Sequence, residues 1–270
     1  MSLKQNKEDT SYMMAISDVM SGLMFIFIIT LAIFVFDFIE ASREHEEEMH
    51  KLTEALNKLG ENNQMRASLL VDIQDELKKR EIDVEIDAEH GVLRLNENAI
   101  RFETGSSDLN EIQIERLGTV AEVLGTILPC YGINPPEHLN CLKDKTEGGD
   151  ESKIATAGKI DSIFVEGHTD NVPIGGRLAR KYQDNWVLSA HRAMFTYREV
   201  AKKQPVLAQM MNNNNQPIIS VSGYGEGRPV PGHEYNTPVS DPVNRRIDFR
   251  FIMTPPSITE AQASMKGNLN

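Results

Sequence analysis

Basic residues are the minority among the charged residues of this sequence. Lys and Arg number 28 against 40 Asp and Glu, which gives a net charge of −12 and a pI near 5.1 over 270 residues. Phosphate groups would be repelled by such a chain, so the composition argues against a nucleic-acid partner. The length allows one sizeable domain with accessory segments.

The motifs that would indicate catalysis are missing. The sequence has no HExxH motif for a catalytic metal and no GxSxG turn for a nucleophilic serine. His168, His191 and His233 could be combined with acids into a metal site, but no pair of them has the required spacing. Ser189 with a nearby histidine could be read as a hydrolase pair. Without a supporting motif we expect no catalytic residue, no metal and no cofactor.

Cysteine is nearly absent. Cys130 and Cys141 are the only two, and a Pro-Pro pair lies between them. Nothing resembles a zinc-binding CxxC motif. In an oxidising compartment the pair could form a local disulfide; the alternative is two free thiols.

Charge is absent from the segment Val19 to Phe36, and Asp18 is the only ionisable residue between Met13 and Phe36. Such a segment, as a helix, spans the roughly 30 Å hydrocarbon core of a bilayer. No small-x-small cleavage site follows it. The sequence therefore predicts an uncleaved transmembrane helix over 13–37. The Lys residues before it favour a cytoplasmic tail over 1–12 and export of everything after it.

Proline is absent and glycine occurs once between Glu40 and Glu85. Apolar residues there follow a three-four spacing: Met49, Leu52, Leu56, Leu59, then Leu70, Ile73 and Leu77. This spacing predicts a helical connector over 38–85 that forms a parallel coiled coil. The alternative is a lone amphipathic helix that lies on its own domain.

The rest of the chain alternates between strand and helix patterns. The expected strands are Val92–Leu95, Ile160–Glu166, Ile218–Val221 and Arg246–Met253, and the expected helices are Leu109–Ile127 and Asp184–Ala201. Asp184 or Asn185 is placed to cap the second helix. This order, βαβαββ, predicts an α/β sandwich over 86–254 with helices on one face of a small sheet. The residues 255–270 have the composition of a disordered tail.

Asp18 is the first candidate functional residue. An ionised carboxylate in a membrane costs about 2.5–3.5 kcal/mol on insertion scales, so such a residue indicates a function. Ser21 and Gly22 follow three and four residues later, on the same helical face. That face is suited to close helix packing or to lining a channel. The alternative is that Asp18 lies at the headgroup level and caps the helix.

Four polar segments form the second constellation. They are Glu166-Gly167-His168-Thr169-Asp170-Asn171, Leu188-Ser189-Ala190-His191-Arg192-Ala193, Ser222-Gly223-Tyr224-Gly225-Glu226 and Asn244-Arg245-Arg246-Ile247-Asp248. The first follows a strand and the second lies on a helix. An acid at a strand end that faces an arginine on a helix can hold a zwitterionic ligand, because Asp accepts an ammonium and Arg a carboxylate.

These segments, in this order over about residues 90–254, resemble the OmpA-like peptidoglycan-binding domain. The resemblance implies that Asp170 and Arg192 contact the diaminopimelate of the peptide stem. It also implies that Thr169, Asn171, Arg245 and Arg246 lie around that pocket or support it. For Arg245 and Arg246 the alternative is a structural ion-pair network.

An OmpA-like domain behind one acid-bearing membrane helix is similar to the MotB family, the B subunits of ion-driven stators. The resemblance implies a homodimer whose helices pass through a pentameric ring of MotA-like subunits. It also implies a bacterial inner-membrane location with a periplasmic domain. Asp18 matches the carboxylate that carries the translocated proton or sodium ion.

The sequence departs from flagellar members, which have Tyr-Ala-Asp and then Thr-Ala-Met-Met. Here Ile16-Ser17-Asp18 precedes Val19-Met20-Ser21-Gly22. This variant, with the long connector, looks closer to the ZorB subunits of the Zorya anti-phage defence system, whose partner is ZorA. Two alternatives stay open: a flagellar stator subunit, and a static OmpA-like cell-wall anchor without ion transport.

Overall fold

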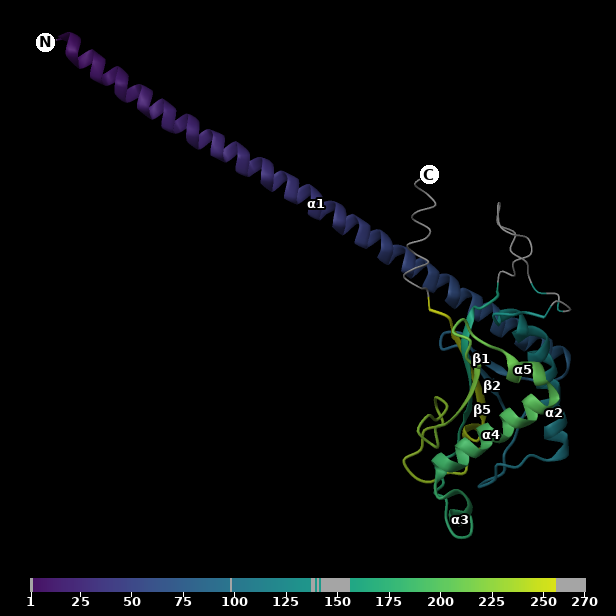
Figure 1. Cartoon of the computed structure of the whole chain (residues 1–270). Coiled ribbons are helices and arrows are strands. Elements are labelled where there is room, and N and C mark those ends of the chain that lie inside the picture. The colour runs from purple at the N-terminus through teal and green to yellow at the C-terminus, as the bar shows by residue number, and fades with distance from the viewer. Residues whose placement is uncertain (1, 98, 137–138, 140, 142–155, 256–270) are drawn as a thin grey trace. The chain divides into compact units, whose positions relative to one another are not determined.

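A computed structural model gives the fold of the chain and describes residues 2–97, 99–136, 139, 141 and 156–255 (Figure 1). The described residues from Lys58 onward form one compact unit, here called the α/β domain. The residues before it belong to a second unit. Apart from Pro255, the tail predicted over 255–270 lies outside the described residues.

The first element, α1, is a single helix over Ser2–Lys79. Its continuity follows from the absence of proline and from long runs of good helix formers. Among the described residues it is the only helix long and apolar enough to cross a membrane, and the qualifying segment begins at Ile16. The side chains from Val19 to Phe36 are exposed, so this part of the helix presents an apolar surface.

The last turns of α1 correct part of the coiled-coil prediction. Leu70, Ile73 and Leu77 are fully buried in the core of the α/β domain and cannot form a seam with a second chain. Gln74 Nε2 also donates to the carbonyl oxygen of Val84 at 2.8 Å. The second half of the connector is therefore an amphipathic helix that packs on its own domain. This was the alternative to the coiled coil, and the three-four spacing is compatible with both. The earlier seam positions, Met49, Leu52, Leu56 and Leu59, are exposed.

The domain is built on one sheet of five strands in the order β1-β2-β5-β3-β4. The strands are β1 Glu85–Asp87, β2 Val92–Leu95, β3 Ile160–Gly167, β4 Ile219–Gly223 and β5 Ile247–Met253. All neighbours are antiparallel except β3 and β4, which are parallel. The four predicted strands are confirmed within a residue or two. The three-residue β1 was not predicted.

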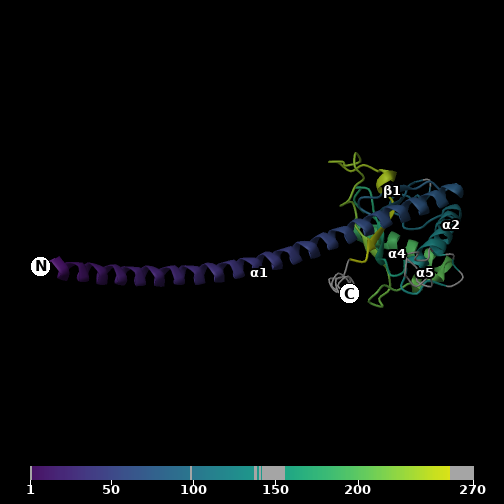
Figure 2. The same cartoon turned by 90° about the horizontal axis from the view of Figure 1, so that it is seen from above.

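Three helices lie on one face of this sheet: α2 Glu111–Ile127, α4 Asn185–Lys203 and α5 Pro205–Gln209 (Figures 1 and 2). The short helix α3 Ala179–Tyr182 lies in the connection before α4 and contacts that helix. The short 3-10 turns are η1 Leu128–Tyr131 and η2 Pro242–Asn244. Asn110 caps α2 in a capping box with Gln113, and Asp184 caps α4 by accepting from Val187 N. The α/β sandwich with helices on one face is confirmed.

The core lies between the sheet and these helices. The inward strand residues alternate, as at Ile247, Phe249 and Phe251 of β5, and meet Leu117, Val120 and Leu124 of α2. Cys130 and Cys141 are joined by a disulfide with a Cα–Cα distance of 5.4 Å. It closes a short loop after α2.

Candidate functional site

The candidate site forms where β3 and β4 end. Parallel strands bring their carboxyl ends to one edge of a sheet, and here the loops that follow are hydrogen-bonded together. Tyr224 N donates to Gly167 O at 3.0 Å, and Thr169 N donates to Gly225 O at 2.9 Å. The N-terminal turns of α4 lie against the same edge. Three of the four segments of the predicted constellation therefore meet at one place.

Two glycines allow α4 to approach this edge. A Cβ on Gly167 would overlap the carbonyl oxygen of Ser189, and one on Gly223 would lie 2.6 Å from Ala190 N. Ser189 itself is fully buried, and its hydroxyl accepts from Gly225 N and donates to Trp186 O. Ser189 thus holds the turn after β4 against the N-terminal turn of α4.

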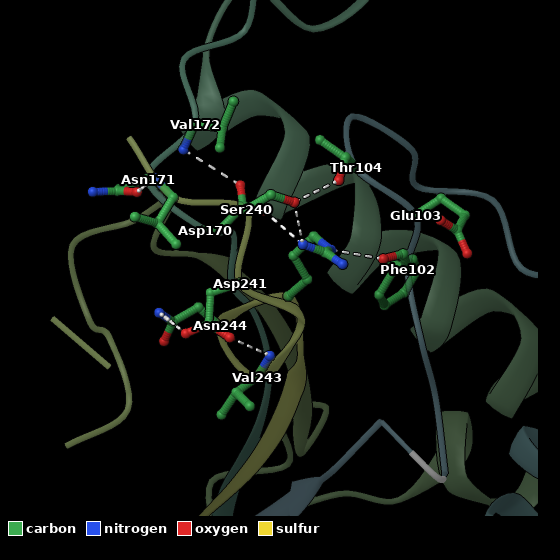
Figure 3. Close-up of polar contacts among 12 residues, drawn as sticks. Phe102, Glu103, Thr104, Asp170, Asn171, Val172, Ser240, Asp241, Val243 and Asn244 are labelled. Carbon is green, nitrogen blue, oxygen red and sulfur yellow. Dashed lines mark hydrogen bonds and ion pairs between the residues drawn. The ribbon is translucent and has the colours of Figure 1, made fainter. Parts of the chain in front are cut away.

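Asp170 is buried at this edge and pairs with Arg245. Its Oδ2 lies 2.8 Å from Arg245 Nη1, and the two side chains expose 6% and 5% of their surface. Arg245 is held further by donation from Nε to Phe102 O at 2.9 Å and from Nη1 to Ser240 Oγ at 3.1 Å (Figure 3). The other carboxylate oxygen accepts weakly from Val172 N. The arginine that neutralises Asp170 directly is therefore Arg245.

Arg192 projects from α4 into the same cluster and is completely buried. Its guanidinium donates to three backbone carbonyls, those of Ser106, His168 and Glu103, at 2.9, 2.8 and 3.2 Å. Burial lowers the pKa of Arg192 to about 10, and the positive charge of Arg245 acts in the same direction, while Asp170 opposes it. The structure brings Asp170, Arg192 and Arg245 together but gives Arg192 no exposed surface.

Asn171 and Thr169 support the edge in different ways. Asn171 Nδ2 donates to the carbonyls of Tyr235 and Thr237 at 2.9 and 2.8 Å, and its Oδ1 accepts from Val239 N at 2.7 Å. Asn171 therefore holds the segment 235–239 beside the site (Figure 3). The Thr169 hydroxyl is buried and has no hydrogen-bond partner among the described residues.

Arg246 belongs to a second cluster, on the sheet face away from the helices. Its Nε lies 3.1 Å from both oxygens of Asp248, and Arg94 Nε lies 3.3 Å from the same carboxylate. Arg250 binds Glu166 through two parallel contacts of 2.8 and 2.9 Å. Arg246 is thus part of a structural ion-pair network, which was the alternative to a place around the ligand pocket. Arg245, in contrast, faces Asp170.

Glu166, His168 and Asp248 could in principle hold a metal, because one ligand atom from each lies within 4.8 Å of the others. Four guanidinium groups surround them, however: Arg94, Arg228, Arg246 and Arg250. Burial, followed by these positive charges, places the pKa of His168 well below its ordinary value. A field that disfavours a proton on His168 also disfavours a metal cation, so the donor set fits a charge network rather than a metal site.

Sequence reasoning assigned no role to Glu166, Asp248 or Arg250. A signal was present in β5, where charged residues at 246, 248 and 250 alternate with large apolar ones at 247, 249 and 251. Alternation of this kind places all the charges on one sheet face. A row of buried charges there must find partners on the neighbouring strands.

Asp18, Ser21 and Gly22 lie on one face of α1, and the side chains of Asp18 and Ser21 are exposed. Ser21 Oγ donates to Ser17 O at 2.7 Å, which satisfies the hydroxyl within the helix. A Cβ on Gly22 would meet nothing within 4 Å. The face is therefore open to another helix.

No protein-family model matches the chain. No curated protein matches it either. Solved structures similar to the chain include a putative MotB like protein from Desulfovibrio vulgaris, at 18% identity and a TM-score of 0.44, with 72% of this chain and 98% of that chain covered. The periplasmic domain of Helicobacter pylori MotB is 16% identical over 66% of this chain and 86% of its own, with a TM-score of 0.40. The cell wall anchor of the T6SS from Pseudomonas aeruginosa is 16% identical over 69% and 97%, with a TM-score of 0.39.

Proposed function

We propose that the chain is a membrane-anchored, peptidoglycan-binding B subunit of an ion-driven rotary motor. The N-terminus lies in the cytoplasm, α1 crosses the bacterial inner membrane once, and the α/β domain lies in the periplasm. Two copies pass through a pentameric ring of MotA-like subunits. Asp18 carries a proton or a sodium ion through the channel formed with that ring, and the domain fixes the dimer to the cell wall.

The observation that carries the wall-binding part is the cluster of Asp170, Arg192 and Arg245. Two guanidinium groups act on one carboxylate within a buried site, so one positive charge lacks a partner of opposite sign inside the cluster. Diaminopimelate in the peptide stem offers both an ammonium and a carboxylate. Its carboxylate would neutralise the excess charge, and its ammonium would compete with Arg245 for Asp170.

Binding of such a ligand requires a small opening of the site. Arg192 is held by the backbone carbonyls of Glu103, Ser106 and His168, and Asp170 is buried against Arg245. We expect the segment 235–245 to shift when peptidoglycan binds, because it carries Arg245, which occupies Asp170 in this structure. Arg245 would then release Asp170 to the ligand.

Retention on purified peptidoglycan tests this part. We expect Asp170→Ala and Arg192→Ala to lose most of the binding of the full chain in detergent. Matched controls are Asp108→Ala, whose side chain is 72% exposed, and Arg101→Ala, whose side chain is 51% exposed. Circular dichroism confirms that each variant is folded. Wild-type retention by both site variants would exclude the assignment.

The ion-carrying part rests on Asp18. It is the only ionisable residue between Met13 and Phe36, and small residues follow it on the same face. A carboxylate at such a position is costly in lipid unless a partner surrounds it. One or two helices cannot enclose a polar path by themselves, so a multi-pass partner must complete the channel.

Dimer formation rests on the first half of the predicted seam. Met49, Leu52, Leu56 and Leu59 keep a three-four-three spacing and are exposed at 49, 53, 57 and 44%. An exposed apolar stripe of this spacing on a long helix is suited to a parallel coiled coil with a second copy. The coiled coil would end before Leu69, where α1 enters the domain core.

An Asp18→Asn variant tests ion transport. We expect it to bind peptidoglycan like the wild type and to lose all motor-dependent activity in cells. Co-purification with the product of the neighbouring gene and particle imaging would show the five-plus-two assembly. Full activity of Asp18→Asn would support the static anchor instead.

We further propose that the motor serves in anti-phage defence of the Zorya type, with ZorA as the partner. The sequence Ile16-Ser17-Asp18 and the long helix after the membrane segment support this over a flagellar stator. Phage protection without an effect on motility would agree with the defence role. Restored swimming in a host that lacks its own stator would favour the flagellar one.

A further inference from the structure

Trp186 is the only tryptophan in the chain, and the structure leaves 54% of it exposed. It is the second residue of α4, just after the capping Asp184. A tryptophan left in water forgoes a large burial energy, and exposed tryptophans are enriched where a ligand or partner binds. The exposure of Trp186 therefore suggests that a ligand or partner binds there.

Trp186 lies beside the Asp170 site. Its neighbour Asn185 is buried and donates to the carbonyls of Asp170 and Val172 at 3.4 and 3.1 Å. Trp186 is the next residue of α4, so its backbone lies one residue away from the contact between Asn185 and the Asp170 turn. The turn at Gly225 joins the two places, because Gly225 O accepts from Thr169 N and Gly225 lies near Trp186.

The turn after β4 leaves room beside the indole. A Cβ on Gly225 would lie 3.3 Å from Trp186 N, and a Cβ on Gly227 would lie 3.8 Å from Trp186 Cζ2. Because both positions are glycine, no side chain from them covers the ring. The indole thus lies near the turn at Gly225 and Gly227 while more than half of the residue stays exposed.

The turn after β4 also carries Tyr224 and Arg228, which face the second cluster. The Tyr224 ring stacks on His168 with centroids 5.5 Å apart, and the guanidinium of Arg228 lies 3.8 Å from its centroid. Arg228 is half exposed. Arg228 follows Gly227, which lies near the indole, so an exposed aromatic ring and a half-exposed cation are separated by one residue of this turn. Such a pair suits a ring that is apolar on one face and carries hydroxyl, amide or carboxylate groups at its edge.

We infer that Trp186 is a glycan-contacting residue, which stacks on a sugar ring of the peptidoglycan strand beside the bound stem peptide. The C–H bonds of a pyranose carry partial positive charge and face the negative π surface of the indole. This inference rests on the proposed peptidoglycan binding and adds to it that the domain recognises the glycan as well as the peptide.

Because Trp186 is the only tryptophan, the intrinsic fluorescence of the full chain in detergent reports on this position alone. Two probes are compared: a GlcNAc–MurNAc disaccharide carrying a diaminopimelate stem peptide, and the same peptide without sugars. We expect the first to change the tryptophan emission and the second to leave it unchanged. Calorimetry with both probes gives the affinities of Trp186→Ala, Trp186→Phe and the control Val71→Ala, which alters an exposed residue of α1.

Trp186→Ala should weaken binding of the disaccharide-peptide on the order of tenfold and leave binding of the free peptide within about twofold of wild type. Trp186→Phe, which keeps an aromatic face, should restore most of the loss. Equal affinities of wild type and Trp186→Ala for the disaccharide-peptide would overturn the inference, as would equal losses for both probes. If the wild type binds neither probe, the proposed peptidoglycan binding itself fails.

Discussion

Arg245 Nη1 lies 2.8 Å from Asp170 Oδ2, and the two side chains expose only 5% and 6% of their surface. A buried pair of this kind is costly to break, because the remaining charge has neither water nor a partner. We expect Arg245→Ala to destabilise the domain by about 3–5 kcal/mol. The double variant with Asp170→Ala should be less destabilised than the sum of the two single ones. Denaturant unfolding of the four proteins measures the coupling, and strict additivity would show that the pair does not interact.

His168 makes the stability depend on pH. Burial, followed by the surrounding arginines, holds the pKa of His168 well below its ordinary value. As the pH falls below about 6.5, the unfolded chain binds a proton that the folded chain does not, so stability decreases. The decrease continues down to the folded pKa, with a slope of up to about 1.4 kcal/mol per pH unit. His168→Gln should flatten the curve in urea titrations, and an unchanged slope would assign the dependence to other groups.

Asp248 acts in the opposite direction. Burial raises the pKa of its carboxyl above 3.8, although Arg246 and Arg94 oppose the rise. The folded state therefore binds this proton more tightly than the unfolded one, and that contribution to stability is lost as the pH rises through the folded pKa. The unfolding free energies of Asp248→Asn and wild type should be compared as a function of pH in the acidic range. The variant should lose the contribution of Asp248 and keep that of His168.

Glu166 and Arg250 form a two-bond pair across β3 and β5. Glu166 is 1% exposed and Arg250 23%, so the arginine can recover some hydration when the carboxylate is removed. We expect Glu166→Gln to cost about 2 kcal/mol of unfolding free energy. The matched control is Glu76→Gln, which loses a surface pair with Lys79 and should leave the unfolding free energy nearly unchanged. Similar losses in both would mean that burial does not strengthen the Glu166 pair.

The two halves of the apolar stripe on α1 should respond differently to the same change. Leu70 is fully buried in the domain core, whereas Leu56 is 57% exposed. Leu70→Ala should destabilise the domain by about 2–5 kcal/mol through lost burial and a cavity. Leu56→Ala should leave domain unfolding unchanged and weaken self-association, which analytical ultracentrifugation in detergent would detect. A dimer unaffected by Leu56→Ala would exclude a coiled coil through this stripe.

The Cys130–Cys141 disulfide closes a loop of 11 residues. The chain-entropy relation gives about 3 kcal/mol for a loop of this length. The double Cys→Ser variant should unfold at correspondingly lower denaturant concentration, and reductant should lower the wild type to the same value. Thiol labelling of protein isolated from cells reports whether the bond forms there, and a reductant-insensitive wild type would show that it does not.

The apolar stripe of α1 shows where prediction from sequence stops. A three-four spacing records that one face of a helix avoids water, and it is the same whether that face meets a second chain or the helix's own domain. Leu56 and Leu70 share one register, and only the folded domain separates their surroundings. The strands were predicted because alternation is local, while β1 was missed because three residues carry too little pattern.

The partners of the arginines could not be predicted for a similar reason. Arg245 and Arg246 are adjacent in sequence, between the turn η2 and the start of β5, and yet they bind different acids. One meets Asp170 at the strand end and the other meets Asp248 on the far face. The sequence shows two cations side by side, but the acid that each one binds depends on strand order and register.

Asn171 holds the segment 235–239 through three contacts, all of which reach main-chain atoms. These three hydrogen bonds do not depend on which side chains that segment carries. Substitutions of the side chains at 235, 237 and 239 should therefore leave the backbone conformation of this segment unchanged. Ligand specificity could therefore change through side-chain substitutions in the segment 235–239, while the Asn171 amide keeps the backbone of that segment in place.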